Sequence, residues 1–360
     1  MSTDGSGQTQ YPESGPPERR GASEPLHVPQ NIWTEAAVDA PRPTAGPADD
    51  GMRIGLWGSP AAGKTTFIGA LRLAALGSGS AYGRWQVIAS DRASEKFMIE
   101  TSHQLSIQRR FPEATQDSLR FSWRFLGDLA GSSYAPRKRW RGGRGDRAKP
   151  GTVQFLLSLL DVPGAFFDDL EEHPETGATI DHLSESAGLI YLFDPTREAA
   201  NSTSFAFLNG TLARMSRKCL EEGRMDGPYL PHHISVCLTK FDDPEVFERA
   251  RRGNWTDAGP DGVPTVHDAE GFFDWLAQDL HGSTMQLVGQ ALRASFHPER
   301  IRFFVTSAIG FASAPGGVVN LRQFGNVNQV EGEPQIIGPV VPHNVMEPVI
   351  SLLLGIQKRG

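Results

Sequence analysis

Short apolar runs alternate with amphipathic stretches from residue 52 onward. Residues 119–125 alternate between apolar and polar positions, which is typical of a half-buried strand. Residues 52–57 form a short run that predicts a strand, and apolar runs predict buried strands at 153–160, 188–193, 234–238 and 301–305. Apolar residues at helical spacing predict helices over 67–77, 91–110, 197–222, 244–252, 271–280, 284–296 and 345–358. Strands that alternate with helices predict a three-layer α/β fold with a mostly parallel sheet.

The first 50 residues differ in amino-acid composition from the rest of the chain. They are rich in Pro, Gly, Ser, Thr and acidic residues, with Trp33 almost alone as a large apolar side chain. Such a segment cannot bury enough apolar surface to offset the entropy of ordering it. We predict a disordered tail over residues 1–50 and a folded domain over residues 51–358, with an insertion at about residues 128–151.

Composition and charge argue against several classes of protein for this chain. The 360 residues are 39% hydrophobic and carry a formal net charge of −7, so the chain can bury a core but has no overall field to hold nucleic acid. Its two cysteines, Cys219 and Cys237, predict neither a disulfide framework nor a zinc site, and fit a reducing cytoplasm. We expect neither secretion nor a membrane span, because no basic leader with an apolar stretch and no long apolar segment is present.

A glycine-rich segment follows the first predicted strand. It reads Gly58-Ser59-Pro60-Ala61-Ala62-Gly63-Lys64-Thr65-Thr66 and matches the pattern GxxxxGK[ST]. Its glycines let backbone N–H groups turn toward phosphate oxygens, and the following helix adds its dipole. Lys64 would reach the β- and γ-phosphates, and Thr65 would offer its hydroxyl to Mg²⁺. The segment therefore predicts a nucleoside triphosphate site.

A second element, Asp161-Val162-Pro163-Gly164, follows the strand predicted at 153–160. An acid at the end of a buried strand can hold a water on Mg²⁺, and the Gly164 N–H can contact the γ-phosphate. The DxxG pattern alone is often only a turn. Its place after the phosphate loop favours the functional interpretation.

The third and fourth elements bear on the base. In Thr239-Lys240-Phe241-Asp242, the carboxylate can accept two hydrogen bonds from guanine N1–H and its 2-amino group, a donor pair that adenine lacks. After the strand at 301–305, Ser307 and Ala308 would place a backbone N–H near the guanine O6. Together these elements predict GTP or GDP rather than ATP.

The four elements, in this order over roughly residues 52–310, resemble those of the TRAFAC-type P-loop GTPases. The resemblance implies a small-GTPase-like sheet in which the strand at 119–125 runs antiparallel to the rest. It also implies that Thr115, in the segment FPEAT, is the Mg²⁺-binding threonine of the first switch, and the alternative is an ordinary loop threonine. Lys64 and Thr115 would then serve catalysis.

A narrower resemblance is to the double-GTPase proteins of bacterial conflict systems. It is carried by GLWGSPAAGKTTF, FPEAT, DVPG and NVMEPVISLLL. Only one phosphate loop is visible in this sequence, so a second GTPase would have to be a partner chain. The resemblance implies a protein effector or partner GTPase.

Two departures from the small GTPases bear on turnover. Ala165 stands where a glutamine that positions the attacking water is found in many of those enzymes, and Pro60 lies within the phosphate loop. We therefore expect slow unaided hydrolysis.

The predicted insertion contains a basic segment at residues 137–149. It could supply an arginine to the γ-phosphate, grip nucleic acid, or contact an effector, and the alternative is a solvated loop. Nucleic acid binding is expected only through this segment.

Our interpretation is a GTP-binding, slowly hydrolysing switch, and two alternatives stay open. A P-loop ATPase or small-molecule kinase would share the phosphate loop but would have no use for the element at 239–242. A nucleotide-binding interaction module without hydrolysis is permitted by the missing glutamine.

Overall fold

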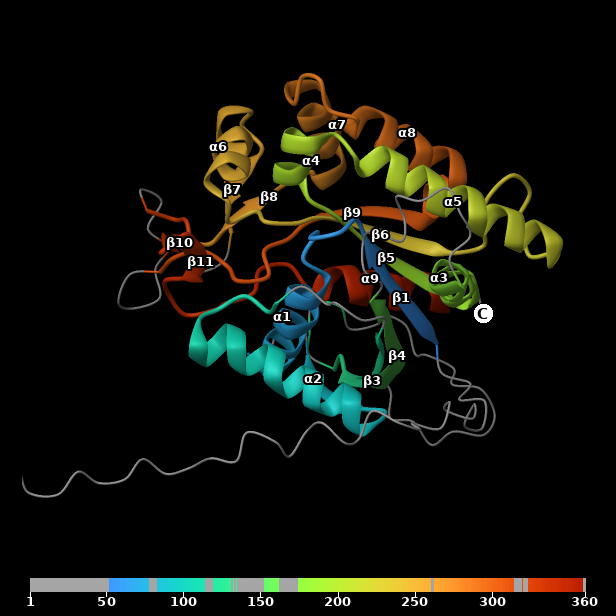
Figure 1. Cartoon of the computed structure of the whole chain (residues 1–360), viewed down its shortest axis with the longest axis horizontal. Helices are drawn as coiled ribbons and strands as arrows, with labels where there is room; N and C mark the ends of the chain where they lie inside the picture. Colours follow the sequence, from blue (N-terminus) through green and yellow to red (C-terminus); the bar gives the residue numbers. More distant parts are fainter. Residues whose placement is uncertain are drawn as a thin grey trace, which may run out of the picture. The chain divides into compact units, whose positions relative to one another are not determined.

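A central sheet separates two helical layers in the computed structural model of the chain (Figure 1). The structure describes residues 52–77, 83–113, 119–130, 132, 134, 152–161, 174–259, 262–313, 319 and 323–358. These residues belong to one unit, Gly51–Gly360. The predicted tail at 1–50 and the basic segment at 137–149 lie outside the described residues.

The sheet of the described residues has seven strands, and the expected mostly parallel α/β fold is confirmed. The strands are β1 (Arg53–Gly58), β2 (Arg84–Ala89), β3 (Leu119–Asp128), β4 (Thr152–Asp161), β5 (Gly188–Phe193), β6 (His233–Leu238) and β9 (Ile301–Val305), in the order β2-β3-β4-β1-β5-β6-β9. β4, β1, β5, β6 and β9 are parallel to one another. β3 is antiparallel to β4, as the resemblance implied, and β2 is an additional edge strand antiparallel to β3.

Helices cover both faces of this sheet (Figure 1). One face is covered by α1 (Lys64–Gly77), α2 (Arg92–His103), the π-helix η1 (Gln104–Gln108) and α9 (Met346–Gln357). The other is covered by α3 (Pro174–Glu185), α5 (Ser204–Glu221), α7 (Ala269–Asp279) and α8 (Met285–Ser295). Further elements are α4 (Pro195–Asn201), α6 (Pro244–Arg252), the 3₁₀ turn η4 (Pro298–Arg300) and two hairpins, β7 (Thr256–Ala258) with β8 (Pro264–Val266) and β10 (Val327–Val330) with β11 (Glu333–Ile336).

The prediction of a single helix over residues 197–222 is wrong, because the helical conformation is interrupted between α4 and α5. Ser202 adopts a left-handed conformation with φ 51°. The buried Glu198 carboxylate accepts hydrogen bonds from Ser204 N at 3.1 Å and from the Thr284 hydroxyl at 2.7 Å. This buried acid holds the start of α5 and the start of α8 together, so the helix cannot continue through residue 202.

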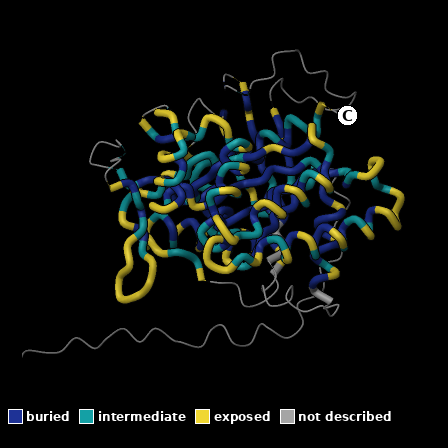
Figure 2. The backbone as a smooth tube through the Cα atoms, turned by 90° about the horizontal axis from the view of Figure 1, so that it is seen from above, coloured by how far each residue is buried: buried dark blue, intermediate teal, exposed yellow. Residues whose placement is uncertain are grey.

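The hydrophobic core lies on both faces of the sheet and fixes β1 at its centre. Ile54 and Leu56 of β1 face the layer of α1 and α9, whereas Trp57 faces α5. Both cysteines lie in this core, in α5 and β6, as free thiols. Figure 2 shows the central strands as the most buried part of the chain. The loops at the ends of these strands are thereby held in place.

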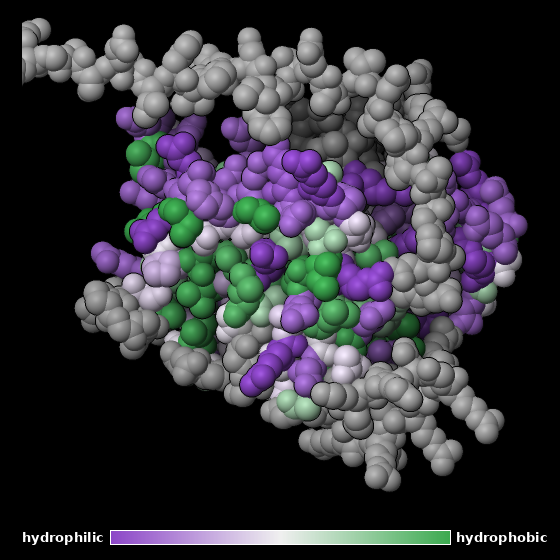
Figure 3. Space-filling view, turned by 90° about the horizontal axis from the view of Figure 1, so that it is seen from below, coloured by the Kyte–Doolittle hydropathy of each residue, from purple (hydrophilic) through white to green (hydrophobic). Residues whose placement is uncertain are grey.

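The layer that contains α1, α2 and η1 leaves part of its apolar surface uncovered by the described residues. Exposed apolar side chains on these elements are Leu76, Ile99 and Ile107. Figure 3, which views the molecule from this side, shows apolar side chains among polar ones. A separate observation is that no helix within the described ranges has the length and apolar character needed to cross a membrane.

Candidate nucleotide-binding site

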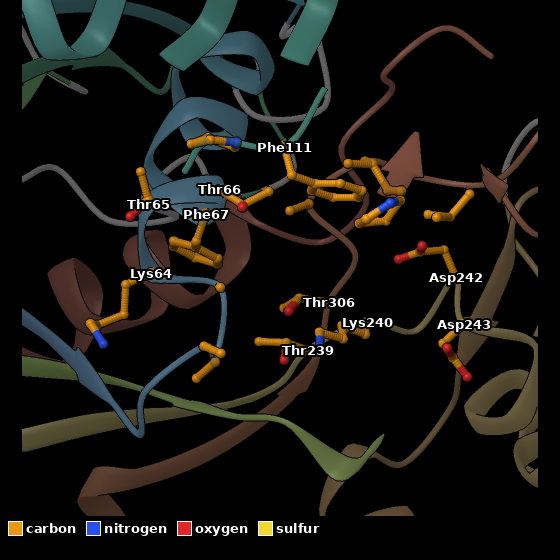
Figure 4. Close-up of a pocket in the computed structure, with 18 of the residues that line it drawn as sticks. Lys64, Thr65, Thr66, Phe67, Phe111, Thr239, Lys240, Asp242, Asp243 and Thr306 are labelled. Carbon is orange, nitrogen blue, oxygen red and sulfur yellow. The ribbon is translucent and has the colours of Figure 1, made fainter. Parts of the chain in front are cut away.

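The loops at the carboxyl edge of the sheet surround one cavity of about 620 Å³. β1 lies between β4 and β5, so the chain connections diverge at its carboxyl end. In open α/β sheets such a divergence leaves a crevice where ligands bind. The cavity is lined by the phosphate loop, by the loops after β6 and β9, by residues 111–113, and by residues around the β10–β11 hairpin. Figure 4 shows Lys64 and Thr65 on one side of it and Asp242 on the other.

The phosphate loop joins β1 to α1 through a tight turn. A Cβ on Gly58 would stand 2.6 Å from the Leu192 carbonyl oxygen, so the close approach of β1 and β5 requires glycine there. Gly63 has φ +90°, and Ala61 is also left-handed with φ 58°. A left-handed conformation is uncommon for a residue with a Cβ and is typical of functional loops. The structure thus explains both fixed glycines of the motif.

Helix α1 begins at the wall of the cavity. Its first hydrogen bond runs from Phe67 N to Gly63 O at 2.7 Å. The amides of Thr65 and Thr66 therefore point along the helix axis toward the cavity, which is the arrangement that binds phosphate. The Lys64 ammonium donates to the carbonyl oxygens of Gly58 at 3.2 Å and Ser59 at 3.4 Å. It is held over the loop where phosphate oxygens would lie. We call the part of the cavity beside the loop at residues 58–66 the phosphate end.

The opposite part of the cavity, which we call the base end, begins with residues 239–243 after β6. Phe241 N donates to Thr306 O at 3.1 Å, so this loop is tied to the end of β9. The Phe241 ring is fully buried between Phe247 and Phe311. Because Phe241 points into the core, its neighbours Lys240 and Asp242 are left to line the cavity.

The Asp242 carboxylate is the most distinctive group of the base end. It is 7% exposed and accepts a hydrogen bond from the Ser307 hydroxyl. Burial raises the pKa of Asp242 to about 6, and the Ser307 hydrogen bond partly opposes this rise. A carboxylate withdrawn from water, with room for a ligand beside it, favours a ligand that donates hydrogen bonds.

Ser307 is fixed by contacts on three sides. Its amide donates to His343 O at 3.0 Å, and His343 N donates back to Ser307 O at 2.8 Å. Its hydroxyl oxygen accepts from Gly310 N at 2.8 Å. A Cβ on Gly310 would approach the Val341 carbonyl oxygen to 1.9 Å, so the turn requires glycine. These contacts hold the Ser307 hydroxyl in position to donate to Asp242. The next residue, Ala308, lines the cavity.

A wall of the cavity that the sequence did not reveal comes from the β10–β11 hairpin and residues 111–113. Val327, Gln329 and Pro334 line the cavity opposite the motif loops, as does Phe111. Ile336 N donates to Arg109 O at 2.9 Å, which joins the hairpin to the segment that precedes Phe111. The signal that could have found it is the Glu331-Gly332 turn between two short runs, but those runs carry too few apolar residues to predict strands.

Other predicted site residues lie at or beyond the limit of the described chain. The backbone of Asp161 ends β4 beside β1, where the register of Leu56 with Leu159 sets it level with Gly58. The side chain of Asp161, and the whole of Gly164, Thr115 and Ala165, are outside the described residues. Their predicted roles stay predictions.

No family model matches the chain, and no curated protein matches it. Among solved structures, it is similar to the signal recognition particle receptor SRb-GTP/SRX complex from Chaetomium thermophilum, with 14% identity, TM-score 0.36, and coverage of 74% of this chain and 94% of that one. It is also similar to Sup35 complexed with GDP, with 12% identity, TM-score 0.29, and coverage of 78% of this chain and 46% of that one. Likeness at this level assigns neither ligand nor activity.

Proposed function

We propose that the chain binds GTP and GDP and acts as a slowly hydrolysing molecular switch. The observation that carries this proposal is the buried Asp242 carboxylate, which faces the same cavity as the phosphate loop. A nucleotide whose phosphates lie on Lys64 and the α1 amides would place its base toward Asp242. Guanine offers two N–H donors to such an acceptor, and adenine offers no equivalent pair.

Mg²⁺ fits the residues at the phosphate end. The Thr65 side chain lies on the first turn of α1 at the cavity wall, and the backbone of Asp161 ends the neighbouring strand. Hydroxyl and carboxylate oxygens are ligands that Mg²⁺ prefers. Together with Thr115 they would hold the ion, which when bound would neutralise charge on the phosphates. Lys64 would bind the same phosphates from the protein side.

Hydrolysis is proposed to be slow without a partner. The sequence has Ala165 where a water-positioning glutamine would be expected. Unaided turnover should be on the order of 10⁻⁴ to 10⁻³ s⁻¹, the intrinsic rate of small GTPases. Single-turnover hydrolysis of radiolabelled GTP measures it. A rate of about 1 s⁻¹ would contradict the expectation and would make Arg141 and Arg144, in the basic segment at residues 137–149, the first residues to substitute.

The decisive test exchanges the base. Asp242→Asn presents an amide donor to the guanine donors, so GTP affinity should fall by about 3 kcal/mol or more. Xanthine carries a carbonyl in place of the 2-amino group, so the variant should recover binding with xanthosine triphosphate. Calorimetric titration of both nucleotides against parent and variant measures this exchange.

Asp243→Asn is the matched control for this exchange. Asp243 also lines the cavity, but its carboxylate caps α6 by accepting from Glu245 N at 2.9 Å. Asparagine keeps such a cap, so this variant should prefer GTP as the parent does. If Asp242→Asn binds GTP as tightly as the parent, or if the parent prefers ATP, the proposal is wrong and an ATPase or kinase becomes the better interpretation.

The biological setting is proposed from the sequence resemblance alone. We propose that the switch works in the cytoplasm within a bacterial conflict system, with a protein effector or a partner GTPase. The motifs that support this are GLWGSPAAGKTTF, DVPG and NVMEPVISLLL. Hydrolysis measured with and without the product of a neighbouring GTPase gene tests it, and no change in rate or binding would count against a partner GTPase.

A further inference from the structure

Lys240 has a fixed backbone and a long side chain at the wall of the base end. Its φ is 59°, in the left-handed region that few residues with a Cβ adopt. Asp243 N donates to Lys240 O at 2.9 Å and maintains this turn. The side chain is 44% exposed. A lysine stem has several rotatable bonds, so the backbone alone does not determine where the ammonium lies.

A buried acid determines the position of that ammonium. Asp194 follows β5 and is 1% exposed. Its Oδ1 accepts hydrogen bonds from Thr196 N at 3.0 Å, Thr196 Oγ1 at 2.7 Å and Arg197 N at 3.2 Å. Its Oδ2 lies 2.5 Å from Lys240 Nζ. One oxygen is therefore occupied at the start of α4, and the other is directed at the lysine.

The sheet brings these two residues together. β5 and β6 are parallel neighbours, with Phe193 opposite Leu238 in the register. The residues that follow them, Asp194 and Thr239-Lys240, leave the sheet side by side at the same edge. Thr239 N donates to Phe193 O at 2.8 Å, which ties the two exits together. The ion pair thus joins two rigid elements instead of two mobile side chains.

We propose that Asp194 is a positioning residue for nucleoside binding, acting through Lys240. It holds the ammonium, so the methylene stem of Lys240 stands as a preformed wall beside the base. A lysine without this partner would have to lose rotamer freedom when the ligand enters. The inference rests on the proposed function, because it assumes that a nucleoside occupies the base end.

A second effect of Asp194 has the opposite sign and makes the proposal testable. A carboxylate near the cavity repels phosphate, so its removal would strengthen binding of every anionic ligand if charge were its only influence. If Asp194 acts by positioning Lys240, its removal would instead weaken the binding of nucleosides. An uncharged nucleoside and inorganic tripolyphosphate therefore separate the two effects.

The experiment uses Asp194→Asn in the full chain. Asparagine can keep the cap at Oδ1 but removes the charge that holds Lys240. We expect guanosine and GDP affinity to fall between about two- and fivefold, the range of one partly exposed ion pair. Mg²⁺-tripolyphosphate should bind no more weakly than to the parent. Guanosine affinity that is unchanged or higher in Asp194→Asn would overturn the inference.

A double-variant cycle shows whether Asp194 acts through Lys240. Lys240→Met keeps an apolar stem and removes the ammonium. Asp194→Asn added to Lys240→Met should weaken guanosine binding no further, and additive losses would mean that Asp194 has only a structural role. Asp268→Asn is the control for a helix cap, since Asp268 accepts from Gly271 N at 3.0 Å and does not line the cavity.

The outcomes also separate this inference from the proposed function. If the parent binds guanosine and Asp194→Asn binds it equally, only the inference fails. If the parent binds adenosine in preference, the guanine proposal fails, and the same cycle run with adenosine still decides the role of Asp194. A parent that binds neither nucleoside would contradict both.

Discussion

The two ends of the cavity are built in different ways. The phosphate end is one continuous segment, residues 58–66, which follows β1 and begins α1. The base end is assembled from residues 239–243, residues 306–309, Phe111 and the β10–β11 hairpin, which are far apart in the chain. A continuous segment can be held by its own turn and helix. A discontinuous one needs the packing of the whole edge of the sheet, as the buried rings of Phe241 and Phe311 show.

This difference predicts separable losses. Substitutions at the phosphate end should weaken binding in proportion to the phosphates carried by the ligand. Substitutions at the base end should weaken nucleosides and nucleotides alike. Guanosine, GDP and GTP are therefore the ligands that compare the two ends.

The largest effect is expected for Lys64→Ala. Loss of charged hydrogen bonds to phosphate, at about 1.5 to 3 kcal/mol each, should reduce GTP affinity by about a hundredfold or more. Guanosine binding should remain as in the parent, because guanosine carries no phosphate and Lys64 lies at the phosphate end, where it contacts carbonyls of its own loop at 3.2 and 3.4 Å. Calorimetry with both ligands measures this.

Thr65→Ala is the companion variant. It should lose chiefly the Mg²⁺-dependent part of GTP affinity, since the hydroxyl would serve the metal and not the phosphates. Equal Mg²⁺ dependence in both variants would contradict the separate roles. Loss of guanosine binding in Lys64→Ala would show that the two ends are not independent.

The same contrast explains how much the sequence could predict. The phosphate loop, β5, β9 and α6 were predicted within a residue or two, because each is a local pattern with its own turn or cap. The mostly parallel sheet followed from their alternation with helices. The edge strand β2 and the helix α3 were missed, because apolar positions are sparse in α3 and β2 is only a short run at the edge of the sheet.

The sequence could not predict the cavity wall that Phe111 and the β10–β11 hairpin form, because these segments are far apart in the chain. Residues 239–242 were recognised as a motif, yet nothing local indicated that Val327 or Phe111 would face Asp242 across a cavity. The hairpin reaches the site because Leu105, Ile309 and Ile336 pack into a small cluster beneath it. Such a contact depends on three separate regions, so it appears only in the folded chain.

A change of pH is expected to have an effect of intermediate size on guanosine affinity. This effect arises at the base end of the cavity and not at the phosphate end. Burial raises the pKa of Asp242 to about 6 in the ligand-free protein. Guanine needs the ionised carboxylate, so guanosine affinity should be full above pH 7 and fall about tenfold for each pH unit below 6. Guanosine is the ligand of choice because it has no phosphate that titrates. Titrations between pH 5 and 8 measure the profile.

The groups around Asp242 determine how this profile is interpreted. His343 lies behind the loop, and burial lowers its pKa to about 4, so it stays uncharged over this range. Lys240 and Asp243 act on Asp242 in opposite directions through their charges. Lys64→Ala should show the same pH profile as the parent. A flat profile would mean that Asp242 does not accept from the base.

The smallest effect concerns the hairpin wall, where Val327 and Val330 offer the same substitution on one strand. Val327 lines the cavity and packs against the cluster of Ile309 and Ile336, whereas Val330 is 45% exposed and does not line the cavity. Val327→Ala removes about 1 kcal/mol of apolar contact, so GDP should dissociate roughly fivefold faster. Val330→Ala should leave the rate as in the parent. Release of a fluorescent GDP analogue, chased with excess GDP, measures both rates. If the two variants release it equally, the hairpin only borders the base end, and the motif loops alone hold the nucleotide.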